Sequence, residues 1–435
     1  MSDARAPTLT AENRARAIAI MALPLGLSFI LSMFLRSAAA VIAPNVRSEL
    51  ALSPTELGAL TAALFLGSSA MQLPAGLMLD RLGPRRTIAL CQLVGAAGAA
   101  SMLVVTDAVG LACAWFAMGI GVAPIYMGMI VLYSRWVPRD RLAQASAISV
   151  ATGGMGFLLS SAPFAAASVW LGWRLAMASV GGLALLFSIL VYSFVRDRPR
   201  DLPPPAGPPE TLIEVVRGLL TVMRDRRVYL LSAMASLSFS TIMAVRSLWV
   251  GPFLNDVYGL NIGELGDIVL LMSIGWVTSA LMYGPMDRRF DTRRGVVTCG
   301  GLAMIVALLG LVVTGERSLT VATLFLVMLA LSASFSAVIF AQARALVADH
   351  LIGRTISTIN LFIWGSVSIV QLVTGAIIDL FPVDAAGRSP SPAYQAVFAA
   401  LAVMVALALY AYRKVEDVPP SVEMARHAAA QKGEG

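Results

Sequence analysis

Two arginines stand inside long apolar runs, and they are the residues in this sequence best suited to bind a charged ligand. Arg36 lies in the apolar run 17–43, and Arg246 lies in the run 228–253. A guanidinium group keeps its positive charge and presents a planar fork of donors that fits two oxygens of a carboxylate or phosphate. Acidic residues lie only at or near the ends of such runs. The sequence therefore predicts that the two arginines bind an anion.

Other roles remain open for these arginines. Arg36 lies eight residues before Pro44, about 12 Å at helical rise, so its side chain has the length to extend toward the outer surface. Either arginine could also cap helix carbonyls or bridge helices. The symmetric occurrence favours anion binding, because extension to the surface does not predict it. Five further residues in the apolar runs are candidate substrate contacts, with packing as the alternative: Tyr126, Tyr133, Trp249, Asn360 and Gln371.

The composition identifies the class of protein that must position these side chains. Hydrophobic residues make up 58% of the chain and charged residues 13%, about half of the ~25% usual in soluble domains. A chain so poor in charge must turn much of its surface toward lipid. A span needs roughly 20 apolar residues, so the 435 residues leave room for about twelve spans and no large soluble domain.

The predicted fold is all-α and integral to the membrane, with twelve transmembrane helices in two pseudo-symmetric six-helix halves. The spans are expected at 17–43, 55–79, 86–105, 108–134, 143–168, 174–195, 228–253, 265–286, 296–314, 319–344, 354–381 and 393–412. The division of the chain follows from these spans: a cytoplasmic N-terminal tail (1–16), the N-terminal half (17–196), a cytoplasmic, Pro-rich linker (197–227), the C-terminal half (228–413) and a cytoplasmic C-terminal tail (414–435).

Positive charge is concentrated in one set of loops. That set holds Arg81, Arg85, Arg86, Arg135, Arg139, Arg141, Arg288, Arg289, Arg293 and Arg294, whereas the opposite loops hold mainly Arg47, Arg174, Arg317 and Arg388. The positive-inside rule then predicts a cytoplasmic (inner) membrane protein with both termini in the cytoplasm. The net charge of +7 has a topological explanation, and we expect no nucleic-acid partner.

Each half repeats one pattern: an arginine within its first span and an Asp-Arg pair at the end of its second. The run Gly76 to Arg86, GLMLDRLGPRR, resembles the signature loop of the major facilitator superfamily; Gly284 to Arg294 is a weaker copy, with Asp291 near the place of a glycine. Gly76 is expected to let its helix approach a neighbour closely. The resemblance implies a latch between the halves, with enforced topology as the alternative, formed by Gly76, Asp80, Arg81, Gly83, Arg85, Arg86, Asp287 and Arg288.

The segment Phe34-Leu35-Arg36-Ser37, taken with Arg246, resembles the organophosphate and organic-anion branch of that superfamily. The resemblance implies a secondary transporter that moves a small organic or phosphorylated anion by alternating access, with both arginines on the anion. Exchange against a counter-substrate, or cotransport with protons or sodium, would drive it. A monomer is expected. The alternatives are a drug or metabolite exporter of the same fold and, from another class, a transporter-like receptor.

Several classes of function lack the residues they need. Neither Lys414 nor Lys432 follows a glycine and precedes Ser or Thr, which excludes a phosphate-binding Walker loop. His350 and His427, the two histidines, fall in a loop and in the tail, and the three cysteines lie in apolar runs. We therefore expect no metal and no cofactor. No nucleophile–base pair stands out, so an enzyme is not expected.

Overall fold

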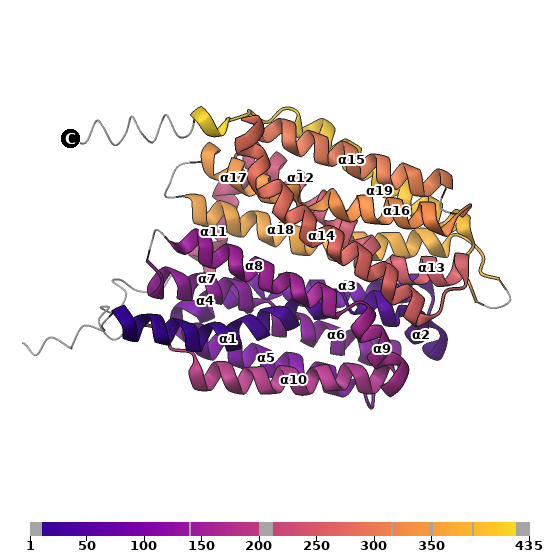
Figure 1. Ribbon diagram of the computed structural model, residues 1–435, viewed down its shortest axis with the longest axis horizontal. Helices are drawn as coiled ribbons and strands as arrows, with labels where there is room; N and C mark the ends of the chain where they lie inside the picture. Colours follow the sequence, from indigo (N-terminus) through magenta and orange to yellow (C-terminus); the bar gives the residue numbers. More distant parts are fainter. Residues whose placement is uncertain are drawn as a thin grey trace, which may run out of the picture. The chain divides into compact units, whose positions relative to one another are not determined.

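Figure 1 shows a computed structural model of the chain, which describes residues 11–138, 141–199, 212–314, 316–347, 351–384 and 387–422. All regular structure in these ranges is helical, as predicted. Both histidines, Arg139, Lys432 and the Pro-rich part of the linker lie outside the described residues. Helix labels follow Figure 1, and the described chain divides into two compact units.

Unit 1 comprises residues 1–36, 63–160 and 170–215. Its helices are α1 (Ala11–Leu35), the second part of α3 (Pro54–Ala70), α4 (Gln72–Arg81), α5 (Pro84–Ser101), α6 (Ala108–Val122), α7 (Pro124–Trp136), α8 (Leu142–Leu159) and α10 (Trp173–Phe194). Helix α5 packs against both α6 and α10, and α1 packs against α8. A Cβ added to Gly156 would lie 2.1 Å from the carbonyl oxygen of Ile30, so glycine is what permits the approach of α8 to α1.

Unit 2 comprises residues 37–62, 161–169 and 216–435. Its helices are α2 (Ala39–Leu50), the first part of α3, α9 (Ala162–Leu171), α11 (Leu212–Met223), α12 (Arg226–Ala244), η2 (Val245–Trp249), α13 (Val250–Tyr258), α14 (Ile262–Phe290), α15 (Arg293–Thr314), α16 (Leu319–Leu331), η3 (Ala333–Phe335), α17 (Ser336–Leu346), α18 (Ile352–Asp379) and α19 (Ser391–Tyr412). Helix α2 comes early in the sequence, yet it packs against α13 and α14 within this unit.

The described helices agree well with the predicted spans. Ten helical stretches are long and apolar enough to cross a membrane, or eleven if α8 and α9, bent by 41°, form one span. The predicted span 86–105 corresponds to the 18-residue helix α5, which is not among those ten or eleven stretches. The first span differs from the prediction, because α1 stops at Leu35 and α2 continues through Pro44 to Leu50. Proline inside the helix is accommodated there, as membrane helices allow.

Side-chain caps mark several helix ends. The carboxylate of Asp107 accepts the backbone N–H of Gly110 at 2.8 Å and starts α6. Asn261 and Glu264 form a capping box at the start of α14, each side chain accepting the other's backbone N–H. These bonds satisfy amides that have no partner inside a helix. Some of the acidic residues at the ends of the predicted spans therefore act as helix caps.

Candidate substrate-binding site

Both buried arginines lie where the helix geometry is interrupted. Residues 36–38 form a turn between α1 and α2, and this turn begins with Arg36. Arg246 lies in η2, a π-helical turn of five residues between α12 and α13. Such interruptions inside spans often mark functional sites, because they redirect side chains and expose backbone groups. The same kind of irregularity therefore accompanies the same residue type in both parts of the sequence.

Arg246 is fully buried, and two serine hydroxyls of unit 2 hold its guanidinium group. Nη1 donates to the hydroxyl of Ser37 at 2.6 Å, and Nη2 donates to the hydroxyl of Ser273 at 2.6 Å. The guanidinium carbon lies 5.8 Å from the ring centroid of Trp276, within the range of a cation–π contact. Hydroxyls do not neutralise a charge, so an anion could replace either of them on Arg246.

Further predicted contacts with aromatic and amide side chains lie on helices of unit 2. Trp249, also fully buried, donates its indole N–H to the hydroxyl of Thr374 at 2.7 Å. Phe239 makes edge-to-face contacts with Trp276 and Trp364, at centroid distances of 5.9 and 5.3 Å. Two more predicted contacts lie on α18: Gln371 is completely buried, and Asn360 is half-buried.

Unit 1 holds the other predicted contacts. Arg36 is 4% exposed, which argues against the alternative that its side chain extends to an aqueous surface. Tyr126, more exposed, stacks on Phe29 with ring centroids 5.2 Å apart. The hydroxyl groups of Tyr133 and Ser149 lie 2.6 Å apart and share a hydrogen bond. Tyr126 and Tyr133, both on α7, therefore have packing or hydrogen-bond partners within unit 1.

The loop that resembles the family signature is organised by a residue that the sequence analysis missed, Asp197. Its carboxylate accepts the backbone N–H of Arg85 at 2.7 Å at the start of α5. Gly83 has φ +82°, and a Cβ there would lie 2.6 Å from that carboxylate, so only glycine fits. Asp80 interacts electrostatically with Arg135. The close approach predicted at Gly76 is wrong in this structure, because a Cβ there would meet no atom within 4 Å.

The weaker copy of the loop has a matching arrangement in unit 2. The carboxylate of Asp417 accepts the hydroxyl of Thr292 at 2.6 Å and the backbone N–H of Arg293 at 3.2 Å, at the start of α15. Asp287 forms an ion pair of 3.6 Å with Arg293. Asp291 takes the left-handed conformation, φ +48°, which explains a glycine at this place in the pattern. Hydrogen bonds from Ser421 hold the pKa of Asp291 below its usual value.

A repeated tripeptide could have revealed these two carboxylates. Asp197 and Asp417 each follow the last span of a half, and each begins an Asp-x-Pro sequence, Asp197-Arg198-Pro199 and Asp417-Val418-Pro419. In both units the acid after the last span therefore caps the helix that follows the signature loop.

Three other predicted latch residues, Arg81, Arg86 and Arg288, are exposed.

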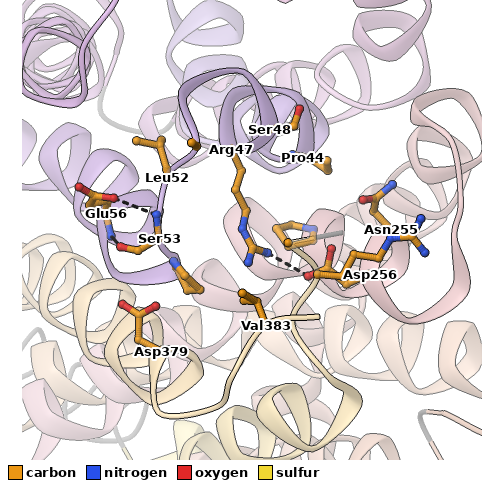
Figure 2. A pocket seen from close by; sticks show the side chains of 15 residues that line it. Pro44, Arg47, Ser48, Leu52, Ser53, Glu56, Asn255, Asp256, Asp379 and Val383 are labelled. Atoms are coloured by element: carbon orange, nitrogen blue, oxygen red, sulfur yellow. Dashed lines mark hydrogen bonds and ion pairs between the residues drawn. The ribbon is translucent and has the colours of Figure 1, made fainter. Parts of the chain in front are cut away.

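A second polar cluster surrounds a cavity of about 590 Å³ in unit 2 (Figure 2). Arg47 forms an ion pair of 2.9 Å with Asp256, and its other terminal nitrogen donates to the hydroxyl of Ser389 at 3.1 Å. Tyr394 also donates to Asp256, at 2.6 Å. The charged lining consists of Arg47, Arg388, Glu56, Asp256 and Asp379. Acids outnumber arginines there, so this cavity suits an anion less well than the surroundings of Arg246 do.

The described residues form helices long and apolar enough to cross a membrane, with buried arginines among them, and the comparisons place the chain among membrane transporters. The model of the Major Facilitator Superfamily matches residues 25–282 and 248–432. The chain belongs to this family. Family membership indicates a transporter rather than an enzyme. The described residues contain no group of three or more metal-ligating side chains.

Individual proteins with recognisable similarity carry transporter names. The chain is 23% identical over 362 residues to the hexuronate transporter of Bacillus subtilis, covering 79% of this chain and 84% of that one. It is 26% identical over 167 residues to a protein of Cupriavidus necator named "Probable sulfoacetate transporter", covering 37% of each chain. A solved bacterial homologue of the human lysosomal transporter Spinster has a TM-score of 0.71 at 19% identity, covering 92% and 96%, which shows the fold alone.

Proposed function

We propose that this protein is a secondary transporter that carries a small organic anion across the cytoplasmic membrane, with Arg246 as the principal anion-binding residue. The observation that carries the proposal is the placement of Arg246: a fully buried guanidinium group whose two terminal nitrogens are held by serine hydroxyls. A buried cation beside neutral acceptors binds an anion strongly, because the low local dielectric strengthens the attraction. The names of its relatives, which include a hexuronate transporter, agree with an organic anion.

Arg36 is proposed as the second cation of the site. The support is its burial, because Arg36 is 4% exposed and a cation buried among membrane-spanning helices usually has a functional role. Tyr126, Tyr133, Trp249, Asn360 and Gln371 complete the proposed set of substrate contacts. Trp249 is the best placed of them, one turn after Arg246 and held by Thr374.

The arrangement in the membrane is also proposed. Arginine-rich loops define the cytoplasmic side, so both termini lie in the cytoplasm. The residues proposed to act on that side as the latch of an alternating-access cycle are Gly83, Asp80, Arg81, Arg85, Arg86, Asp287 and Arg288. Apolar spans without a central carboxylate favour exchange, or cotransport in which a proton or sodium ion accompanies the anion. The protein is proposed to work as a monomer.

The proposal is tested by binding of D-glucuronate, a hexuronate, to the purified full chain, measured as thermal stabilisation and as counterflow in proteoliposomes. Arg246→Ala is expected to lower the affinity about tenfold to a hundredfold, as loss of a charge-assisted hydrogen bond does. Arg246→Lys keeps the charge but not the fork, and it is expected to fall in between. Arg388→Ala, at the other cavity, is the matched control and should change nothing.

Three results would overturn the assignment. Undiminished stabilisation by D-glucuronate in Arg246→Ala would remove Arg246 from the site. Stabilisation of the wild-type protein only by neutral or cationic compounds would show that the substrate is not an anion, and it would favour an exporter of the same fold. Loss of binding in Arg388→Ala, with Arg246→Ala unaffected, would move the site to the cavity beside Arg47.

A further inference from the structure

Unit 2 buries two glutamines on neighbouring helices, and their carboxamides differ in hydrogen bonding. Gln342, on α17, uses both ends: its amide nitrogen donates to the carbonyl oxygen of Glu416 at 2.8 Å, and its oxygen accepts the hydroxyl of Tyr412. Gln371, on α18, is equally buried, yet within the described residues neither its nitrogen nor its oxygen has a hydrogen-bond partner. Gln342 has a structural role that its contacts explain, whereas Gln371 does not.

An unsatisfied buried carboxamide lowers stability, and a methionine or leucine of similar size would avoid the cost. The backbone of this turn contacts α3, because a Cβ on Gly58 would lie 2.7 Å from the carbonyl oxygen of Gln371. The amide nitrogen and oxygen of the Gln371 side chain have no hydrogen-bond partner among the described residues and are available to a ligand.

Two hydrogen bonds between helices fix the position of Gln371 along the helix axis relative to that of Arg246. Ser240 and Ser366 have their hydroxyls 2.6 Å apart, and Trp249 donates to Thr374 at 2.7 Å. Residue numbers rise together along the two helices, so the stretch from α12 to α13 runs parallel to α18, against which α12 packs.

Arg246 comes three residues before Trp249, and Gln371 comes three residues before Thr374. Three residues span about 4.5 Å of the α-helix α18, and Arg246 and Trp249 lie in the same five-residue π-turn. Arg246 and Gln371 therefore lie at a similar position along two adjacent helices of unit 2, between the same two hydrogen bonds.

We propose that Gln371 recognises a hydroxyl group of the substrate beside the carboxylate that Arg246 binds, so that the substrate class is hydroxy-carboxylates. The inference rests on the proposed function. A carboxamide offers one acceptor oxygen and two N–H donors. Its oxygen accepts the O–H of an alcohol, and its N–H groups donate to the oxygen of the alcohol. Nitrate and ionised carboxylates without a hydroxyl group only accept hydrogen bonds. No acidic residue lies in 226–255 or 352–378, so neither segment offers a carboxylate to Arg246.

The test compares two dicarboxylates that differ only in hydroxyl groups, tartrate and succinate, with D-glucuronate as a third probe. The wild-type full chain is expected to bind tartrate and D-glucuronate more tightly than succinate. Gln371→Met should weaken both hydroxylated acids about tenfold and leave succinate unchanged, because only the hydroxyl loses its partner. Affinities come from thermal stabilisation titrations and from competition with labelled D-glucuronate in proteoliposomes.

Gln342→Met is the matched control, and thermal stability separates the two roles. This variant should melt at a lower temperature than wild type and keep the tartrate-to-succinate ratio. Gln371→Met should melt at the wild-type temperature or above it, since it removes an unsatisfied polar group. A lower melting temperature with an unchanged ratio would show that Gln371 is structural and would overturn the proposal.

The outcomes also separate this inference from the proposed function. If Arg246→Ala abolishes binding of every acid but Gln371→Met leaves the ratio unchanged, the anion site stands and hydroxyl recognition by Gln371 is refuted. If Arg246→Ala changes nothing, the proposed function fails first. Wild-type protein that binds succinate as tightly as tartrate, or that binds no hydroxylated acid, also contradicts the hydroxy-carboxylate class.

Discussion

Arg47 and Asp256, 209 positions apart in the sequence, form an ion pair of 2.9 Å within unit 2. The carboxylate of Asp256 also accepts from the backbone N–H of Ser389 at 2.9 Å. A second carboxylate, Asp379, accepts the backbone N–H of Thr55 at 3.0 Å at the start of α3. Residues 37–62 are thus fastened to later helices by charged and polar bonds.

The Arg47–Asp256 pair is expected to contribute measurably to stability, because both side chains are nearly buried, at 10% and 7% exposure. Arg47→Ala should lower the free energy of unfolding by up to about 3 kcal/mol, since it leaves a buried carboxylate with neutral donors only. A double-mutant cycle with Asp256→Asn, followed by thermal unfolding in detergent, measures the coupling. A coupling energy within about 0.5 kcal/mol of zero would show that the pair adds nothing.

Gly251 sets the separation of α13 and α2. A Cβ at this position would lie 1.9 Å from the carbonyl oxygen of Ala40, a backbone atom that cannot rotate away. Gly251→Ala should therefore destabilise the protein by about 1–3 kcal/mol, the usual cost of overpacking. Gly284→Ala in α14, where a Cβ meets nothing within 4 Å, should be neutral or stabilising by up to about 1 kcal/mol. Equal melting temperatures for the two variants would contradict this contrast.

Asp417 should be the stronger of two helix caps, and Asp197 the weaker. Asp417→Ala removes an acceptor for two backbone amides, of Arg293 and Arg294, and for the hydroxyl of Thr292. We expect a loss of about 1–2 kcal/mol, the range for removal of a helix cap. Asp197→Ala removes one such amide bond, to Arg85, and should cost about 1 kcal/mol. Thermal unfolding of both variants, beside the corresponding Asn substitutions, checks the order; a larger loss at Asp197 would reverse it.

Much of the fold could be predicted because its cause is local. Apolar runs of span length, bounded by prolines and polar residues, determine where membrane helices lie whatever their neighbours are. The helix interruptions at Arg36 and at Arg246 were not predicted. A turn at residues 36–38 and a π-turn at residues 245–249 depend on contacts between helices, which hydrophobic periodicity does not report.

The candidate site shows the same division between local and tertiary causes. A buried arginine is visible in the sequence, because its charge contrasts with its surroundings. Its partners are not: Ser37 and Ser273 are two among many serines in the spans, and only the packing of α14 and the turn before α2 brings them to Arg246. The exception is the Asp-x-Pro repeat of Asp197 and Asp417, a signal that internal comparison of the halves could have found.

Ser37 and Ser273 are expected to hold Arg246 in place until an anion replaces them. Ser37→Ala leaves Nη1 of Arg246 without this acceptor, which should lower the melting temperature of the ligand-free protein by an amount equivalent to about 1 kcal/mol. A carboxylate on Arg246 restores an acceptor, so stabilisation by D-glucuronate should be larger in Ser37→Ala than in wild type. Ser273→Ala should behave alike.

Ser247→Ala is the control for both variants. In the part of the chain that the structure describes, the hydroxyl of Ser247 donates to the sulfur of Met243 at 3.4 Å and makes no hydrogen bond to Arg246. The ligand-induced shift of this variant should equal that of wild type. If Ser37→Ala lowers the melting temperature and also reduces the shift, Ser37 itself contacts the bound anion, and the replacement described above is wrong. A shift that grows in Ser37→Ala and Ser273→Ala alone is what competition between hydroxyl and anion for one guanidinium group requires.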